Sequence, residues 1–405
     1  MPSMNHRSVL LSIYQAALDR VHGREAVRSY LLTQELKKGT HVVAIGKAAC
    51  AMAQGAVDVL GEQVGDVLVI TKTGHLEDLC TQAGIACIEA DHPVPDERSL
   101  EAGQGLLRFL CEHPQGPFLF LVSGGASSLA EVLPDGIGLE QLKELTRWLL
   151  SSGLPIQDMN RIRRSLSCIK GGKLLNHLDE VSSSQVLLIS DVMGDDLAAI
   201  GSGLLYPSDS GINPHDLPAA IQTWWQPCEV MKSRRHIRHT VVASLDQAMG
   251  AAADAARAYG YSVTLHEAKL EGDAAQTGKE LALKLKNELE PGIHIWGGET
   301  TVALPEHPGR GGRNQHLALS AAVELDGAEG LYLLAAGTDG TDGPTEDAGA
   351  LVDGSTLERG QLEGLVAVNH LAAADAGSFL DASGDLVSTG PTGTNVMDLV
   401  ISLKV

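Results

Sequence analysis

The sequence is poor in aromatic residues, which make up only 3% of its 405 residues, while glycine occurs 45 times. Small residues suit the close packing of helices on a sheet better than an aromatic-rich sandwich. The hydrophobic share is 44%, and a chain of this length exceeds what one hydrophobic core usually serves. We therefore expect an α/β protein of two domains.

Positive charge and long apolar runs are also scarce. Lys and Arg number 30 against 51 Asp and Glu, a net charge of −21, whereas nucleic acids and anionic membranes need a broad basic face. Neither is expected as a partner. The chain lacks an apolar run of about 18 residues, and its N-terminal apolar residues follow helical spacing instead of a signal-peptide core. A soluble, cytoplasmic protein is expected, and the sequence leaves open whether it forms a homo-oligomer.

The cysteines show no metal-binding or secretory pattern. They contain no CxxC pair and lie mostly beside apolar residues, at positions 50, 80, 87, 111, 168 and 228. This pattern is typical of reduced, buried thiols in a cytoplasmic protein. Neither a disulfide framework nor a zinc site is predicted.

Three familiar catalytic fingerprints are missing. The absence of G-x-x-x-x-G-K-[ST] excludes a P-loop kinase. After the first predicted strand the sequence reads "GKAACA" and not G-x-G-x-x-G, so a nicotinamide site of the usual kind is unsupported. The segment "LVSGGASSL" lacks the G-x-S-x-G nucleophile elbow, which argues against a serine hydrolase.

Short apolar runs alternate with helical patterns along the chain, the rhythm of a parallel sheet covered on both faces. The first series of predicted strands comprises 41–45, 66–71, 84–90, 118–123 and 185–190. A stretch rich in Pro, Trp and basic residues at 205–239 interrupts it, and "KSRRHIRH" (232–239) is interpreted as a solvated linker. The second series comprises 240–244, 261–266, 292–298, 300–304, 331–337 and 396–403. We predict domains at 1–231 and 232–405.

Groups suited to anions gather where predicted strands end. In open α/β sheets ligands bind beyond the carboxyl ends of the strands, where glycine-rich turns and helix N-termini present free N–H groups. Cations nearby would add to the attraction. The candidates for an anion site are Lys47, Ser123, Gly124, Gly125, Ser127, Arg161, Lys170, Arg313, Asn314, Thr392 and Asn395.

Carboxylates gather at other strand ends, most densely in "AAGTDGTDGPTEDAGA" (335–350). Crowded carboxylates suit a divalent cation held through oxygen, as magnesium is when shared with phosphates, although a solvated acidic turn is the plain alternative. The candidates are Asp191, Glu299, Asp339 and Asp342. Phosphate, carboxylate and magnesium sites together indicate phosphoryl transfer.

Eight segments taken together resemble the class II glycerate 2-kinases. The resemblance runs from about residue 6 to the C-terminus through "IGKAACAMA", "VSGGASSL", "MNRIRRSLSCIKGGKL", "LISDVMGDD", "WGGETTV", "GRGGRNQHLAL", "GTDGTDGPTEDAGALVDG" and "STGPTGTNVMDLVI". Residues 292–405 resemble the MOFRL domain of that family. The resemblance implies ATP- and Mg²⁺-dependent phosphorylation of D-glycerate to 2-phosphoglycerate. It also implies a cleft between a Rossmann-like, doubly wound N-terminal domain and an α/β C-terminal domain with a mostly parallel or mixed sheet.

The same resemblance assigns roles to residues. Lys47 matches the lysine of "GKAA" and Arg313 the arginine of "GGRN"; with Asp191 they are the expected catalytic residues. Ser123, Gly124, Gly125 and Ser127 match the glycine-rich loop, and Asp191, Glu299, Asp339 and Asp342 match acidic, metal-binding positions. The loop 201–210 and Arg310 depart from the family pattern. Two alternatives stay open: an NAD(P)H-dependent hydroxypyruvate reductase, and a non-catalytic protein that binds a nucleotide or a sugar acid.

Overall fold

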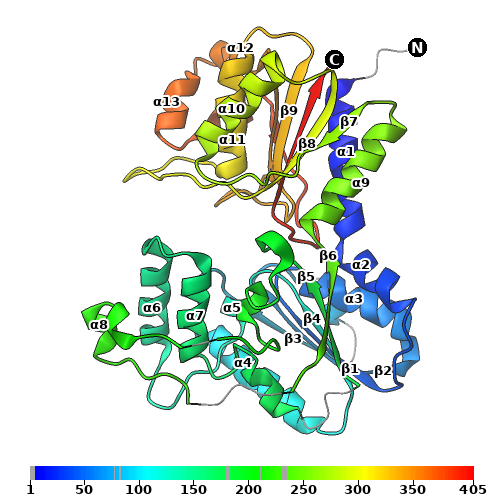
Figure 1. The fold of residues 1–405 in the computed structure, drawn as a ribbon, viewed down its shortest axis with the longest axis vertical. Helices are drawn as coiled ribbons and strands as arrows, with labels where there is room; N and C mark the ends of the chain where they lie inside the picture. The colour runs from blue at the N-terminus through cyan, green and yellow to red at the C-terminus, as the bar shows by residue number, and fades with distance from the viewer. Residues whose placement is uncertain (1–4, 77, 82–83, 179–182, 210, 230–234) are drawn as a thin grey trace. The chain divides into compact units, whose positions relative to one another are not determined.

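A computed structural model describes residues 5–76, 78–81, 84–178, 183–209, 211–229 and 235–405. The chain divides into two compact units (Figure 1). Unit 1 comprises Met1–Val21 and Ser244–Val405, and unit 2 comprises His22–Ala243. Each is built around its own sheet, as the length and composition predict.

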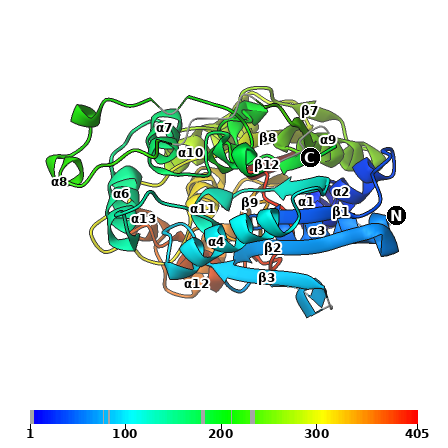
Figure 2. The same cartoon turned by 90° about the horizontal axis from the view of Figure 1, so that it is seen from below.

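Unit 2 contains a parallel sheet of six strands in the order β3-β2-β1-β4-β5-β6. Figure 2 shows β1, β2 and β3 of this sheet side by side. The strands are β1 (Thr40–Ile45), β2 (Val64–Lys72), β3 (Ile85–Ala90), β4 (Phe118–Val122), β5 (Gln185–Ile189) and β6 (Arg238–Ala243). Strand order reverses between β1 and β4, so the sheet is doubly wound and its topological switch point lies there. The α/β class and the doubly wound N-terminal sheet are confirmed.

Helices cover both faces of this sheet because its strands are apolar on both sides; every residue of β4 is buried. A second, smaller core, which includes Leu142, Ile162 and Ile221, joins α6, α7 and α8. The helices of unit 2 are α2 (Gly23–Leu31), α3 (Ala49–Leu60), α4 (Glu97–Glu112), α5 (Ala126–Leu129), α6 (Leu139–Ser151), α7 (Ile156–Leu166) and α8 (Ala219–Gln222).

Unit 1 contains a mixed sheet in the order β11-β10-β9-β12-β8-β7. Only the β7–β8 pair is parallel among its described ladders. The strands are β7 (Val263–Leu265), β8 (Gly292–Gly298), β9 (Leu331–Gly337), β10 (Gly349–Asp353), β11 (Leu386–Val387) and β12 (Asp398–Lys404). The mixed form of the second sheet agrees with the predicted fold class.

Helices α1 and α9 lie on one side of this sheet, and α10 to α13 lie on the other (Figure 1). Alternating small and large apolar residues of α10, α11 and α14 form the core under the second group. The helices of unit 1 are α1 (His6–Val21), α9 (Leu245–Ala258), α10 (Ala274–Asn287), α11 (Arg313–Leu325), α12 (Thr356–Leu362), α13 (Ala367–Ala372) and α14 (Ala376–Ala382).

The structural units differ from the predicted domain ranges, 1–231 and 232–405, at two places. Residues 240–244 were expected to open the second series, but β6 pairs with β5 and completes the first sheet. Helix α1 belongs to unit 1, where its buried Tyr14 donates a hydrogen bond to the Gly337 carbonyl at 2.7 Å. Such pairings join residues far apart in the chain, so local patterns do not reveal them.

Three local predictions need correction. Residues 300–304 form an isolated bridge at Thr301 instead of a strand, whereas β10 and β11 were not predicted. Residues 232–234 of the predicted linker lie outside the described residues, and Arg238 already belongs to β6.

The expectation of reduced cysteines was wrong for four of the six. The structure joins Cys80 to Cys87 and Cys168 to Cys228, while Cys50 and Cys111 are not disulfide-bonded. Tertiary packing brings these thiols together across spacings that match no recognised motif.

Among the described residues, no helix has the length and apolar character needed to span a membrane.

Candidate active site

Two loops of unit 2 are joined at the switch point of the sheet. Lys47 follows β1, and its backbone N–H donates to the Gly124 carbonyl at 2.9 Å. The buried Ser123 hydroxyl accepts the Ala48 N–H at 3.1 Å, at the start of α3. The predicted lysine and the predicted glycine-rich loop therefore lie together at the carboxyl ends of β1 and β4.

Glycine is required where these loops meet. A Cβ atom on Gly46, whose φ is +133°, would lie 2.1 Å from the Ser123 hydroxyl oxygen. A Cβ atom on Gly125, whose φ is +88°, would lie 3.4 Å from Lys47 Cγ and 3.1 Å from His92 Cδ2. The Lys47 side chain thus passes over the glycine turn, beside His92. Sequence reasoning missed His92, although it stands two residues after a predicted strand.

Ser127 takes part in a chain of polar side chains behind the glycine turn. Its hydroxyl oxygen lies 2.8 Å from that of the buried Ser202, which donates to Asn160 Oδ1 at 3.0 Å. Asn160 lies on α7. This chain connects the glycine turn to the helical part of unit 2.

Two predicted phosphate-binding cations have other partners. Arg161 forms an ion pair with Asp158, one turn earlier on the exposed side of α7. Lys170 forms an ion pair with Glu131, and both side chains are buried. Burial lowers the pKa of the Lys170 ammonium, while Glu131 opposes that shift. Neither cation is brought to the Lys47 loop by a described contact.

Arg313 begins α11 in unit 1 and is held by two carboxylates. Its Nε and Nη2 donate to the two oxygens of Asp398 at 2.5 and 3.0 Å, and its Nη1 lies 2.8 Å from Glu299 Oε1. Burial works to lower the pKa of Arg313, but Asp398 and then Glu299 raise it above its ordinary value. The predicted Arg313 and Glu299 therefore meet. Sequence reasoning did not predict Asp398; the feature that could have indicated it is an acidic residue at the start of an apolar strand.

Asp342 serves the helix instead of facing outward. Its carboxylate accepts the Asn314 and Gln315 backbone N–H groups at 3.1 and 2.8 Å, so it caps the N-terminus of α11. Burial raises the pKa of Asp342 to about 7, against the two N–H donors. A Cβ atom on Gly312 would lie 2.3 Å from the Asp342 carboxyl carbon, so this approach requires glycine.

Asp339 and Asp398 each have a carboxylate oxygen near Gly337, at the end of β9. A Cβ atom on Gly337 would lie 3.5 Å from one oxygen of Asp339 and 3.4 Å from one oxygen of Asp398. Burial, and then the charges of these two aspartates, raises the pKa of Tyr14, whose hydroxyl binds the Gly337 carbonyl. Both oxygens accept hydrogen bonds, that of Asp339 from the Thr341 N–H and hydroxyl and that of Asp398 from Arg313 Nη2.

The remaining predicted residues lie on loops of their own units. Asp191 is half-buried just beyond the carboxyl end of β5 in unit 2. In unit 1, the Thr392 hydroxyl donates to the Thr338 carbonyl at 2.5 Å, which ties the loop before β12 to the end of β9. Asn395 is half-buried in the same loop.

A second group of potential metal ligands, His41, Asp66 and His113, lies at the amino ends of β1 and β2, with ligand atoms within 4.8 Å of one another. However, His41 Nδ1 already accepts the Asp66 backbone N–H at 3.0 Å. The two imidazoles also stack with centroids 3.9 Å apart, so they cannot both direct a nitrogen at one ion in their ring planes. We do not assign a metal to this group.

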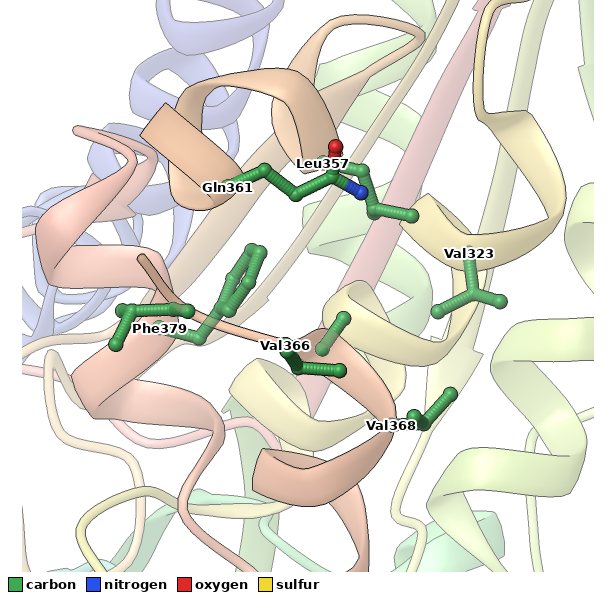
Figure 3. Close-up of a pocket in the computed structure, with 8 residues that line it drawn as sticks. Val323, Leu357, Gln361, Val366, Val368 and Phe379 are labelled. Carbon is green, nitrogen blue, oxygen red and sulfur yellow. The ribbon is translucent and has the colours of Figure 1, made fainter. Parts of the chain in front are cut away.

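A cavity of about 280 Å³ in unit 1 is apolar and lies away from the predicted residues. Val366 and Phe379 line it together with Leu357 and Val323, and the polar Gln361 stands at its edge (Figure 3). None of its lining residues carries a charge. It offers no group suited to phosphate or magnesium.

Comparisons with known proteins match both halves of the chain. Residues 9–226 match the family model "Domain of unknown function (DUF4147)", and residues 292–398 match the MOFRL family. The D-glycerate 2-kinase of Thermotoga maritima is 36% identical over 98% of this chain and 98% of that protein. A crystal structure of glycerate kinase from the same organism has a TM-score of 0.85 and 35% identity, covering 99% of each chain. An Agrobacterium vitis protein that carries the provisional name of a hydroxypyruvate reductase is 37% identical over 97% of this chain and 93% of that protein.

Proposed function

The chain belongs to the glycerate 2-kinase family, and we propose that it transfers the terminal phosphoryl group of ATP to the 2-hydroxyl of D-glycerate, giving 2-phosphoglycerate. The predicted family and its C-terminal MOFRL domain are thereby confirmed. The observation that carries the activity is the full-length match to a D-glycerate 2-kinase, in sequence and in fold. The position of the Lys47 loop, at the switch point of the sheet in unit 2, agrees with a kinase activity.

Lys47 and the glycine turn are proposed to bind phosphate oxygens. The turn brings backbone close to the lysine because only glycine fits at positions 46 and 125. Ser123 is proposed to hold the turn in place, since its hydroxyl already accepts the Ala48 N–H. Phosphoryl transfer needs little covalent chemistry from the protein, so positioned cations are the main contribution expected of these loops.

The donor set fits magnesium, which prefers oxygen ligands. The candidates are Asp339, which follows β9 in unit 1, and Asp191, which lies beyond the end of β5 in unit 2. Magnesium, when bound, neutralises phosphate charge as the phosphoryl group moves. Asp342 is left out because its oxygens cap α11, and Glu299 is engaged by Arg313. Activity should therefore stop in excess EDTA and return when magnesium is added.

Arg313 and Asn314 are proposed to contact the anionic substrate in unit 1, with Thr392 and Asn395 supporting the neighbouring loop. Asp191 is proposed as a catalytic carboxylate of unit 2, beyond the end of β5. Arg161 and Lys170 are not included, because each pairs with a carboxylate of its own. A cytoplasmic location is proposed because ATP is the phosphoryl donor; cell fractionation would test it.

One experiment separates this function from its rival. The protein is incubated with D-glycerate, ATP and magnesium while ADP is followed, and in parallel with hydroxypyruvate and NADH or NADPH. The Agrobacterium vitis relative favours a reductase by name, whereas the "GKAACA" turn lacks the dinucleotide fingerprint. ADP formation without oxidation of NADH or NADPH is expected, and phosphorus NMR of the product should show the phosphate on the 2-hydroxyl. Oxidation of either cofactor without ADP formation would reject the kinase in favour of the reductase.

A further inference from the structure

The two carboxylates that hold Arg313 differ in exposure. The Asp398 side chain is 6% exposed and binds the guanidinium through Nε and Nη2. The Glu299 side chain is 47% exposed and lies against Nη1 of the guanidinium. The buried edge of the Arg313 guanidinium, formed by Nε and Nη2, therefore faces Asp398, and its outer nitrogen, Nη1, faces Glu299.

The partner on the buried edge is fixed by the sheet. Asp398 is the first residue of β12 and stands in register with Gly298 of β8 and Gly337 of β9. The paired strands on both sides hold its backbone, and a Cβ atom on Gly337 would lie 3.4 Å from one of its carboxylate oxygens. A two-pronged bond to arginine sets the guanidinium plane as well as its position.

The partner on the outer edge is the more exposed of the two carboxylates. Glu299 follows β8, and its backbone N–H donates to the Leu270 carbonyl at 2.9 Å. Its backbone is therefore anchored while its carboxylate faces solvent. Exposed ion pairs contribute little, so another oxyanion can take the place of this carboxylate on Nη1 at small cost.

We propose that Asp398 is the positioning residue of Arg313, and that Glu299 is a counter-ion displaced by the anionic ligand that Arg313 binds. This inference rests on the proposed function, which places Arg313 beside the substrate. The ligand is an oxyanion, either the carboxylate of D-glycerate or a phosphate of the nucleotide. Separate titrations with each distinguish the two sources.

The first test compares Glu299→Gln with Glu306→Gln, which removes one negative charge from an exposed site in the same loop. Calorimetry gives the Kd for D-glycerate and for ADP, and turnover gives KM and kcat. In Glu299→Gln we expect Kd and KM for one of the two anions to fall about two- to fivefold, with kcat within about twofold. Glu306→Gln should match the wild type.

Two results of this test would overturn the proposal. Unchanged or weaker binding of both anions by Glu299→Gln would show that Glu299 does not compete with a ligand. A raised magnesium requirement would make Glu299 a metal ligand instead. If the wild type forms no ADP, the proposed kinase activity fails, yet the calorimetric comparison still tests the role of Glu299.

The second test uses Asp398→Asn, which keeps the shape but removes the charge. We expect kcat to fall about tenfold or more, because a guanidinium displaced by about 1 Å is poorly aimed. In this background Glu299 is the remaining charged partner of Arg313, so Glu299→Gln should tighten anion binding more than it does in the wild type. If Asp398 were merely structural, the ratio of the anion Kd without and with Glu299→Gln would be the same in the wild type and in Asp398→Asn. Wild-type kcat in Asp398→Asn, or an equal ratio in both backgrounds, would contradict the positioning role; if Asp398→Asn does not fold, the first test decides.

Discussion

The Lys170 ammonium and the Glu131 carboxylate form an ion pair in which the two side chains are only 1% and 5% exposed. The Ser167 hydroxyl also donates to Glu131, so the carboxylate is satisfied on both oxygens. A buried charge without its partner is costly, because the interior cannot solvate it. Lys170 therefore supports the fold behind the glycine turn.

Removing one member of this pair should destabilise the protein strongly. We expect Lys170→Met and Glu131→Gln each to lower the free energy of unfolding by about 3–5 kcal/mol, and the Lys170→Met/Glu131→Leu double variant to lose less than their sum. Arg161→Ala, which breaks the exposed pair with Asp158, should cost less than about 1 kcal/mol. Urea unfolding measures all four variants. A Lys170→Met protein as stable as the wild type would refute the buried pair.

Removal of Lys47 and removal of Arg313, the two cations proposed for the active site, should have different effects. For Lys47→Ala we expect kcat to fall on the order of 10²-fold with a smaller change in KM, similar to the loss of a preorganised donor. Arg313→Ala should lower kcat similarly but also reduce stability by roughly 1–3 kcal/mol, because it leaves the buried Asp398 unpaired. Steady-state kinetics and thermal unfolding measure the two effects. Near wild-type kcat in either variant would remove that residue from the proposed site.

Asp342 should make stability depend on pH. Burial raises its pKa from 3.8 to about 7, so the folded protein holds this proton more tightly than the unfolded chain. Its contribution is therefore present below about pH 4 and is lost as the pH rises through 7. The Asn314 and Gln315 N–H groups donate to separate oxygens of Asp342, so Asp342→Asn, which cannot ionise, keeps an acceptor for one of the two bonds. Between about pH 5 and about pH 8 we expect the free energy of unfolding of this variant, measured in urea, to rise by roughly 1–3 kcal/mol relative to that of the wild type. If the two proteins showed the same dependence of unfolding free energy on pH, the raised pKa of Asp342 would be contradicted.

The disulfides should contribute unequally. Cys168 and Cys228 are 60 residues apart, whereas Cys80 and Cys87 are 7 apart. Because a longer closed loop restricts the unfolded chain more, loss of the first bond should cost about 4 kcal/mol and loss of the second about 2 kcal/mol. Unfolding of Cys168→Ser/Cys228→Ser and Cys80→Ser/Cys87→Ser compares them. Alkylation of all six cysteines without a reductant, read by mass spectrometry, would show that neither bond forms.

The sequence by itself determined strands β1 to β5, β7, β8, β9 and β12, and the loops that carry Lys47, Ser123, Gly124 and Asp339. These features are local. An apolar run of five to seven residues followed by a glycine-rich turn reads the same way wherever the strand lies in a sheet, and the polar residue after it reaches the carboxyl end.

Only the tertiary structure decided which groups lie next to each charged side chain. Lys47 and Lys170 both adjoin glycine in the sequence, yet Lys47 lies beside the Gly125 turn and Lys170 is buried against Glu131. Arg313 and Asp398 are 85 residues apart, and strand register brings them together. The choice of partner depends on burial and on long-range contacts, because a charge removed from water must be neutralised by whatever the fold places next to it.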